Sequence, residues 1–243
     1  MLPSDLDAPR LFAIVLIFAA WMLYSPILKY FGHGTLNAQL HVVRLRWMRM
    51  SLEANRENRV FDGILLGQLS GSISFFGSAT LIVLAGLVGT LASINHVYES
   101  VNGIPFLPTI SLPLFTIYFA VVTFIMSVSF FSFAYALRKL GYTIALIGGL
   151  MEAKMSNAHS HVMVAQTATV LTESVKSLNN GIRGFYFAVA GLFLFVGPVA
   201  TIGMTLAIAG VLMYRQGFSP EALAIERYVQ AMRDYEAEQP VRD

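Results

Sequence analysis

The second apolar run of the chain carries the most regular set of residues that could do chemistry. Its glycines and serines recur every four residues, so each row lies along one side of a helix. The two rows are Gly63, Gly67 and Gly71, and Ser70, Ser74 and Ser78. Small residues let helix backbones approach closely in lipid, whereas hydroxyl groups around an oligomer axis can line a water-filled conduit. The pattern therefore indicates either a helix-packing face or a conduit face.

Two ionisable residues stand at the edges of apolar runs. Asp62 comes just before the second run and Arg183 just before the fourth. They could pair across helix ends, or each could be solvated in the headgroup zone. No acidic, basic or histidine residue falls in the middle of an apolar run. This absence argues against a proton relay or a charge-coupled transporter, because such pathways normally place ionisable residues at mid-membrane.

The sequence contains no pattern typical of an enzyme or a cofactor site. Cysteine is absent, which excludes disulfides, thiolate zinc sites and cysteine nucleophiles. His159 and His161 are two residues apart and diverge on a helix, unlike the i, i+4 pair of a helical zinc site. No acid/base pair and no phosphate-binding glycine loop is visible. We therefore predict a protein that is not an enzyme and that binds no cofactor or metal.

The positions of lysine and arginine predict a membrane protein. Neither occurs in residues 60–137 or 184–214, whereas residues 29–59 and 138–183 hold eleven of the sixteen. Charged residues make up 12% of the chain, about half the roughly 25% of an average soluble domain. Cytoplasmic loops of membrane proteins retain lysine and arginine, so both basic segments are predicted to lie in the cytoplasm. The net charge of +2 does not indicate a nucleic-acid partner.

Four apolar runs are long enough to cross a bilayer, which takes about 20 helical residues. They cover residues 10–30, 63–94, 110–137 and 184–214. Four crossings with cytoplasmic basic segments put both termini outside the inner (cytoplasmic) membrane. We expect an all-α integral membrane bundle of four transmembrane helices with cytoplasmic amphipathic helices, forming a domain over residues 1–218.

The first cytoplasmic segment, residues 35–60, is patterned as an amphipathic helix. Its apolar residues recur at spacings of four and three and form one stripe. The stripe consists of Leu40, Val43, Trp47, Met50 and Ala54. Such a helix can lie among anionic lipid headgroups or pack its stripe on a neighbouring helix, and both alternatives stay open. The candidate lipid-contacting residues are Arg44, Arg46, Trp47 and Arg49.

Two further amphipathic helices are predicted. Residues 150–180 show apolar stepping by four and three, so this segment is expected to meet another helix. After the fourth span, Ser219 can cap a helix and Pro220 suits its first position. We expect a short C-terminal helix at residues 219–238, on the outer side of the membrane.

Several short strings together resemble the bacterial and plant membrane family called domain of unknown function 599. They include Trp47-Met48-Arg49, Asn58-Arg59 followed by Asp62, Ser74-Phe75-Phe76, and Asn180-Gly181-Ile182-Arg183. The resemblance covers residues 40–220 and implies a similar span count and similar cytoplasmic helices. It implies no activity, substrate or catalytic residue. The strings gather where the first basic helix enters the second span and where the fourth span begins.

These patterns favour a role in assembly. We expect an oligomeric or accessory subunit that associates with copies of itself or with a membrane complex, in contact with lipids that include anionic ones. The alternative is an oligomeric passive channel or small-solute conduit lined by the second span.

Overall fold

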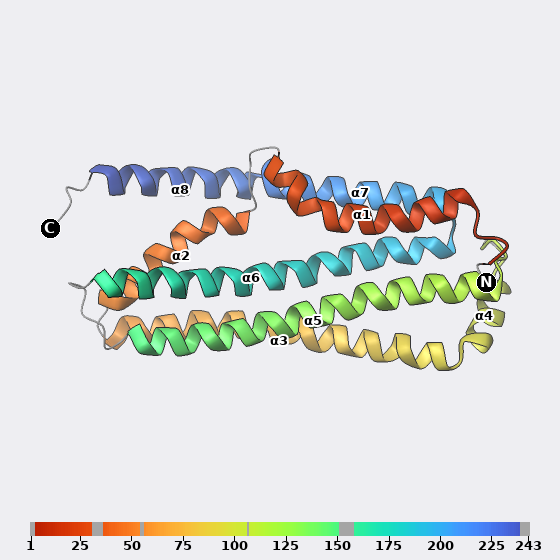
Figure 1. Cartoon of the computed structure of the whole chain (residues 1–243), viewed down its shortest axis with the longest axis horizontal. Helices are drawn as coiled ribbons and strands as arrows, with labels where there is room; N and C mark the ends of the chain where they lie inside the picture. The colour runs from red at the N-terminus through yellow and green to blue at the C-terminus, as the bar shows by residue number, and fades with distance from the viewer. Residues whose placement is uncertain (1–2, 31–35, 54–55, 106, 151–157, 239–243) are drawn as a thin grey trace. The chain divides into compact units, whose positions relative to one another are not determined.

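A computed structural model gives the fold of the chain. It describes residues 3–30, 36–53, 56–105, 107–150 and 158–238. Within these residues every regular element is a helix and none is a strand (Figure 1), which confirms the predicted all-α class. The helices are α1 (Ala8–Tyr30), α2 (Leu36–Glu53), α3 (Arg56–Ala92), α4 (Ile94–Asn102), α5 (Leu112–Leu150), α6 (Ala158–Leu192), the 3-10 turn η1 (Phe193–Phe195), α7 (Pro198–Gly217) and α8 (Pro220–Glu238).

Four stretches of helix are long and apolar enough to cross a membrane. They are Ala8–Leu28, Val60–Ala92, Leu112–Leu150 and Pro198–Glu238. The chain is therefore a multi-pass membrane protein. The most apolar part of Leu112–Leu150 is 39% buried by the rest of the chain, whereas that of Val60–Ala92 is 6% buried. Of the four stretches, the second therefore leaves the most surface for contacts outside the chain.

The chain divides into two compact units whose charges differ sharply. The apolar unit consists of Met1–Tyr24, Ser74–Ala134 and Leu178–Val211. The basic unit consists of Ser25–Ile73, Tyr135–Ser177 and Leu212–Asp243. Fourteen of the sixteen lysines and arginines fall in the basic unit. The division of the chain by packing thus coincides with its division by charge.

In the apolar unit, glycines let α6 approach α5 closely. A methyl group on Gly184 would overlap Ser129 Oγ, and one on Gly181 would lie 2.6 Å from the Phe133 ring. Ser129 and Phe133 are both buried. Only a residue without a side chain fits these two positions, which is the physical reason for glycine at position 181 of the Asn180-Gly181-Ile182-Arg183 string.

In the basic unit, polar side chains join the same two helices. Ser174 Oγ donates to the carbonyl oxygen of Ala136 over 2.7 Å, and Lys139 Nζ donates to Ser177 Oγ over 3.0 Å. Hydrogen bonds that cross between helices fix their rotation and register more narrowly than apolar contacts do.

The expected fourth span at residues 184–214 is not one helix. α6 ends at Leu192, η1 follows, and α7 begins at Pro198. Gly197 has a φ of 141°, a conformation that favours glycine, and Pro198 stands where a helix readily starts. The two sides of this turn, Leu178–Leu192 and Pro198–Val211, both belong to the apolar unit. The apolar run is continuous in sequence, but α6 ends near the middle of that run.

The bounds of the predicted cytoplasmic helices differ in the structure, whereas the C-terminal helix agrees with its prediction and is α8 (Pro220–Glu238). Residues 56–60 already belong to α3, and the predicted helix at 150–180 is the first part of α6, with 151–157 outside the described residues. Ser219 caps α8 as expected, because its Oγ accepts a hydrogen bond from Ala222 N over 3.2 Å.

A contact between α8 and α2 bears on the predicted placement of α8 outside, across the membrane from α2. Arg49 on α2 lies 3.9 Å from Glu236 on α8, and the Arg46 guanidinium lies 5.1 Å from the centre of the Tyr235 ring. Helices in contact cannot lie on opposite faces of a bilayer. Which side of the membrane the two helices share stays a prediction.

The close approach of α5 and α6 predicts a large difference between two glycine substitutions. Gly184→Ala should lower the free energy of unfolding by about 1–3 kcal/mol, because overpacking forces buried atoms apart. Gly203→Ala on α7 is the matched control, since a methyl group there meets no atom within 4 Å. Thermal unfolding of the detergent-purified variants measures both, and equal melting temperatures would contradict this packing.

Candidate functional site

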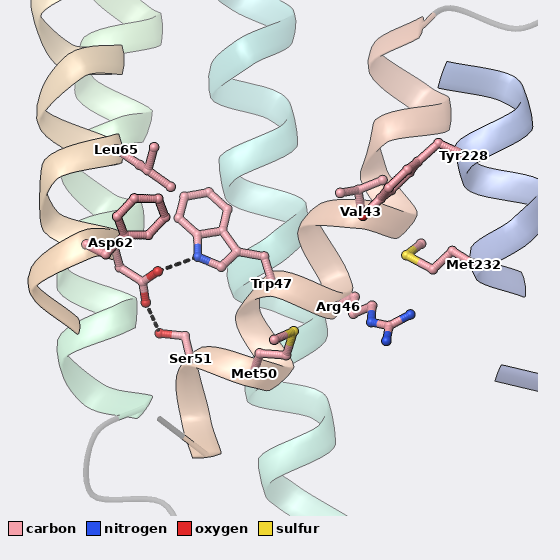
Figure 2. A pocket seen from close by; sticks show the side chains of 10 residues that line it. Val43, Arg46, Trp47, Met50, Ser51, Asp62, Leu65, Tyr228 and Met232 are labelled. Atoms are coloured by element: carbon pink, nitrogen blue, oxygen red, sulfur yellow. Dashed lines mark hydrogen bonds between the residues drawn. The ribbon is translucent and has the colours of Figure 1, made fainter. Parts of the chain in front are cut away.

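A pocket of about 410 Å³ lies in the basic unit between α2, the first turns of α3, and α8. Figure 2 shows it from close by, with α2 crossing between the other two helices. Its walls are formed by Val43, Arg46, Trp47, Met50, Ser51, Phe61, Asp62, Leu65, Tyr228 and Met232. The pocket therefore combines an apolar lining with one carboxylate and one guanidinium group.

The Asp62 carboxylate is the most constrained polar group of the pocket. Trp47 Nε1 donates to its Oδ1 over 2.6 Å, and Ser51 Oγ donates to its Oδ2 over 2.7 Å (Figure 2). Trp47 and Ser51 are one turn apart on α2, so both donors come from one face of that helix. Asp62 is 9% exposed. The two strings that contain Trp47 and Asp62 thus meet in a single cluster.

Both hydrogen-bond donors described at this carboxylate are uncharged groups. Among the residues that the structure describes, no cationic nitrogen lies within 4 Å of Asp62. Arg46 also lines the pocket, but in Figure 2 its side chain extends toward α8 and away from Asp62. The side chain of Arg59, one turn earlier on α3, lies outside the described residues. Buried carboxylates are usually paired with a cation, so a carboxylate held only by neutral donors is unusual.

The predicted apolar stripe of α2 faces the pocket rather than a tightly packed helix. Val43, Trp47 and Met50 all line it, and Met50 is 60% exposed. The fully buried residue of this helix is Met48, outside the stripe. The stripe therefore supplies apolar surface that the chain itself leaves partly uncovered.

Each candidate lipid-contacting residue has a partner within the basic unit. Arg44 donates from one nitrogen to the carbonyl of Asn37 (3.1 Å) and to Thr172 Oγ1 (3.3 Å), and removal from water lowers its pKa below the ordinary value. Arg46 and Arg49 contact α8, and Trp47 contacts Asp62. These contacts within the chain agree with the alternative in which α2 packs on neighbouring helices. Their contact with lipid stays a prediction.

Asp62 and Arg183 each bind other residues. Arg183 donates to Asn180 Oδ1, and its guanidinium lies 4.9 Å from the centre of the Tyr24 ring. All three of these residues belong to the apolar unit, whereas Asp62 belongs to the basic unit. A direct pair between Asp62 and Arg183 therefore stays a prediction.

The glycines and serines of α3, which we call the glycine–serine face, are mostly open within the described part of the chain. A methyl group on Gly63, Gly67 or Gly71 would meet no atom within 4 Å. Ser74 and Ser78 are exposed, and Ser70 is half-buried. These three hydroxyls make no hydrogen bond to a described residue, whereas Ser72 and Thr80 on the same helix donate to carbonyls one turn earlier. The packing partner that the sequence predicted for this face does not lie within the described chain.

The structure also pairs a serine with a lysine, which the sequence did not predict. Lys139 Nζ donates to Ser177 Oγ and lies 3.7 Å from a carboxylate oxygen of Glu173. A catalytic pair needs a neutral lysine that accepts the serine proton. Here the lysine donates, and Ser177 donates in turn to the carbonyl of Glu173 over 3.1 Å. The pair joins α5 to α6 and is not arranged for catalysis.

The Asp62 cluster predicts unequal effects of removing the two tryptophans. Trp47→Phe should destabilise the protein by about 1–3 kcal/mol, because it removes one of the two donors that a buried carboxylate requires. Trp21→Phe on α1 is the control, since Trp21 makes no hydrogen bond to a described residue. Unfolding followed by circular dichroism compares them. If Trp47→Phe cost no more than Trp21→Phe, the hydrogen bond to Asp62 would contribute nothing.

Comparison with known proteins agrees with the resemblance in the sequence. The family described as "Protein of unknown function, DUF599" matches residues 11–221, well over half of the chain. This stretch includes the Asp62 cluster, the glycine–serine face and the α5–α6 contact, while Tyr228 and Met232 of the pocket follow it. No curated protein and no solved structure matches the chain significantly. The chain belongs to the DUF599 family of proteins of unknown function.

Proposed function

We propose that the protein is a non-enzymatic membrane subunit that assembles with copies of itself or with a partner through the glycine–serine face of α3. The observation that carries this proposal is the contrast between two sets of glycines. Gly181 and Gly184 are filled by side chains of α5, whereas Gly63, Gly67 and Gly71 have no neighbour within the described chain. Because the chain already uses glycine for close helix contact, the open set is suited to the same contact with another molecule.

The chemistry of the bilayer supports this proposal. Small residues at four-residue spacing drive helix association in lipid through close van der Waals contact. Only 6% of the most apolar part of the second span is buried by its own chain. A hydroxyl in hydrocarbon without a partner is unfavourable, so Ser74 and Ser78 gain most from a second helix or from water.

The second candidate is a passive channel or small-solute conduit. It is favoured by those same hydroxyls, which are exposed and make no hydrogen bond within the described chain. If α3 helices surround an axis, the serine row would face water instead of a neighbouring backbone. Both candidates require an oligomer, and they differ in whether water reaches Ser74.

The charge division supports a revised orientation in an inner (cytoplasmic) membrane. The apolar unit contains only five charged residues, and the basic unit contains fourteen cationic ones. We place the basic segments 29–59 and 138–183 on the cytoplasmic side, keep the N-terminus outside as the sequence predicted, and place α8 on the same side as α2, which it contacts. Exposed arginines of this unit, such as Arg49, then face the anionic lipid headgroups of that leaflet.

The assembly proposal predicts a loss of oligomer when the glycine face is filled. Gly67→Leu should reduce the native mass to that of a monomer in mild detergent, because the leucine side chain prevents backbone approach. Gly203→Leu is the matched control, since it places the same side chain on an open position of another apolar helix. Native mass spectrometry reads the stoichiometry, and a wild-type monomer without partners would overturn the proposal.

A single introduced cysteine can separate the two candidates, because the chain has no cysteine of its own. Ser74→Cys should form a disulfide-linked dimer on oxidation if two copies meet at this face. Rapid reaction of the same thiol with a membrane-impermeant maleimide in the intact oligomer would favour the conduit. Slow reaction together with efficient cross-linking would favour the packed subunit.

The revised orientation predicts the side of the C-terminus. Green fluorescent protein fused after Asp243 should fluoresce in a bacterial host, and alkaline phosphatase at the same position should be inactive, because both report a cytoplasmic location. Phosphatase fused after Ser100, between the second and third spans, should be active. An active C-terminal phosphatase fusion would instead support the four-span arrangement.

A further inference from the structure

The pocket beside Asp62 contains a negative charge that the described chain does not neutralise. Among the described residues, the carboxylate accepts hydrogen bonds from the Trp47 indole and the Ser51 hydroxyl, and both donors are uncharged. Burial strengthens electrostatic interactions because the local dielectric constant is low. A ligand cation that reaches this carboxylate would therefore gain more free energy than at an exposed one.

The remaining walls of the pocket suit an apolar body and a cationic head. Val43, Met50, Phe61, Leu65 and Met232 supply aliphatic, thioether and phenyl surface. Trp47 and Tyr228 supply aromatic rings, whose faces attract cations. The volume of about 410 Å³ falls within the range of roughly 300–1,000 Å³ that is typical of small-molecule sites.

Among the described residues that line the pocket, Arg46 is the cationic one, and its guanidinium already has a partner. The Arg46 guanidinium lies against the Tyr235 ring on α8, and Figure 2 shows it extending away from the carboxylate. An anionic ligand near Asp62 would meet a like charge, whereas a cationic ligand would meet an opposite charge without displacing an ion pair.

We propose that the pocket between α2, α3 and α8 binds an amphipathic amine, with its ammonium group on the Asp62 carboxylate and its apolar chain along Val43, Met50, Phe61 and Leu65. This inference does not depend on assembly through the glycine–serine face. Two kinds of ligand have this chemistry: a soluble alkylamine and a lipid with an amine headgroup. The lipid has a route to the site, because Phe61 and Leu65 belong to a stretch that can cross the membrane.

The test uses the full-length protein in phosphatidylcholine nanodiscs and hexylammonium as the probe, with empty nanodiscs as the blank. Isothermal titration calorimetry should detect saturable binding of hexylammonium, and weaker or no binding of hexanoate and hexanol, which keep the chain and change the head. Equal binding of the three probes, or no saturable binding of hexylammonium, would overturn the proposal.

Variants locate the binding within the pocket. Asp62→Asn should weaken hexylammonium binding by about 10- to 100-fold, because it removes the charge and keeps the size of the side chain. Met232→Trp keeps the carboxylate and should also abolish binding by filling the pocket from α8. Glu236→Gln is the matched control, since this carboxylate on α8 pairs with Arg49 and does not line the pocket. Unchanged affinity in both Asp62→Asn and Met232→Trp would place the binding elsewhere and overturn the proposal.

Lipid composition separates the two sources. If an amine-headed lipid occupies the site, the affinity for hexylammonium should fall as phosphatidylethanolamine replaces phosphatidylcholine, and Asp62→Asn should remove this competition. An affinity that is independent of phosphatidylethanolamine supports the same ammonium site with a soluble amine as its ligand.

Discussion

The close antiparallel contact between α5 and α6 is the constraint on which each unit depends. In the apolar unit the contact is made by glycine against side chain, at Gly184 with Ser129 and Gly181 with Phe133. In the basic unit it is made by hydrogen bonds, from Ser174 to Ala136 and from Lys139 to Ser177. Small residues allow close backbone approach and dispersion contact between helices, and hydrogen bonds between helices add a directional constraint on their register.

The same residue type has two different uses in this chain. Glycine on α6 is filled by α5, whereas glycine on the exposed side of α3 is open. In a soluble helix an open glycine only weakens the helix. In a membrane helix it leaves a groove that a second helix can enter, and this is why the open row bears on the proposed assembly.

Asp62 connects the fold to the pocket. Its carboxylate fixes the start of α3 against α2 through Trp47 and Ser51. Well-packed apolar side chains of similar volume would hold the two helices together equally well. The presence of a carboxylate there therefore calls for an explanation beyond stability. The pocket that opens beside the carboxylate offers one, because it places apolar surface and aromatic rings around the charge.

Much of the fold could be predicted from residue types and spacing. Apolar runs and the distribution of lysine and arginine predicted a helical membrane protein, and Ser219 was correctly expected to cap the last helix. These features depend on the residues nearby in the sequence and on whether a segment is apolar or charged, so a short stretch of sequence is enough to predict them. The turn near Gly197 had a local signal too, the Gly197-Pro198 pair. It was missed because hydropathy continues unbroken across the turn.

The pocket could not have been predicted, because its residues come from three helices. Spacing along α2 identified an apolar stripe, but spacing cannot say whether a stripe meets a helix, a lipid or a cavity. That depends on α8, which follows α2 by more than 160 residues and reaches it only after the chain turns at residues 193–197. The sequence by itself determined that the chain enters a membrane and is helical, since both follow from local composition and periodicity. Only the tertiary structure decided which faces are filled and which stay open, because that depends on contacts between helices far apart in the chain.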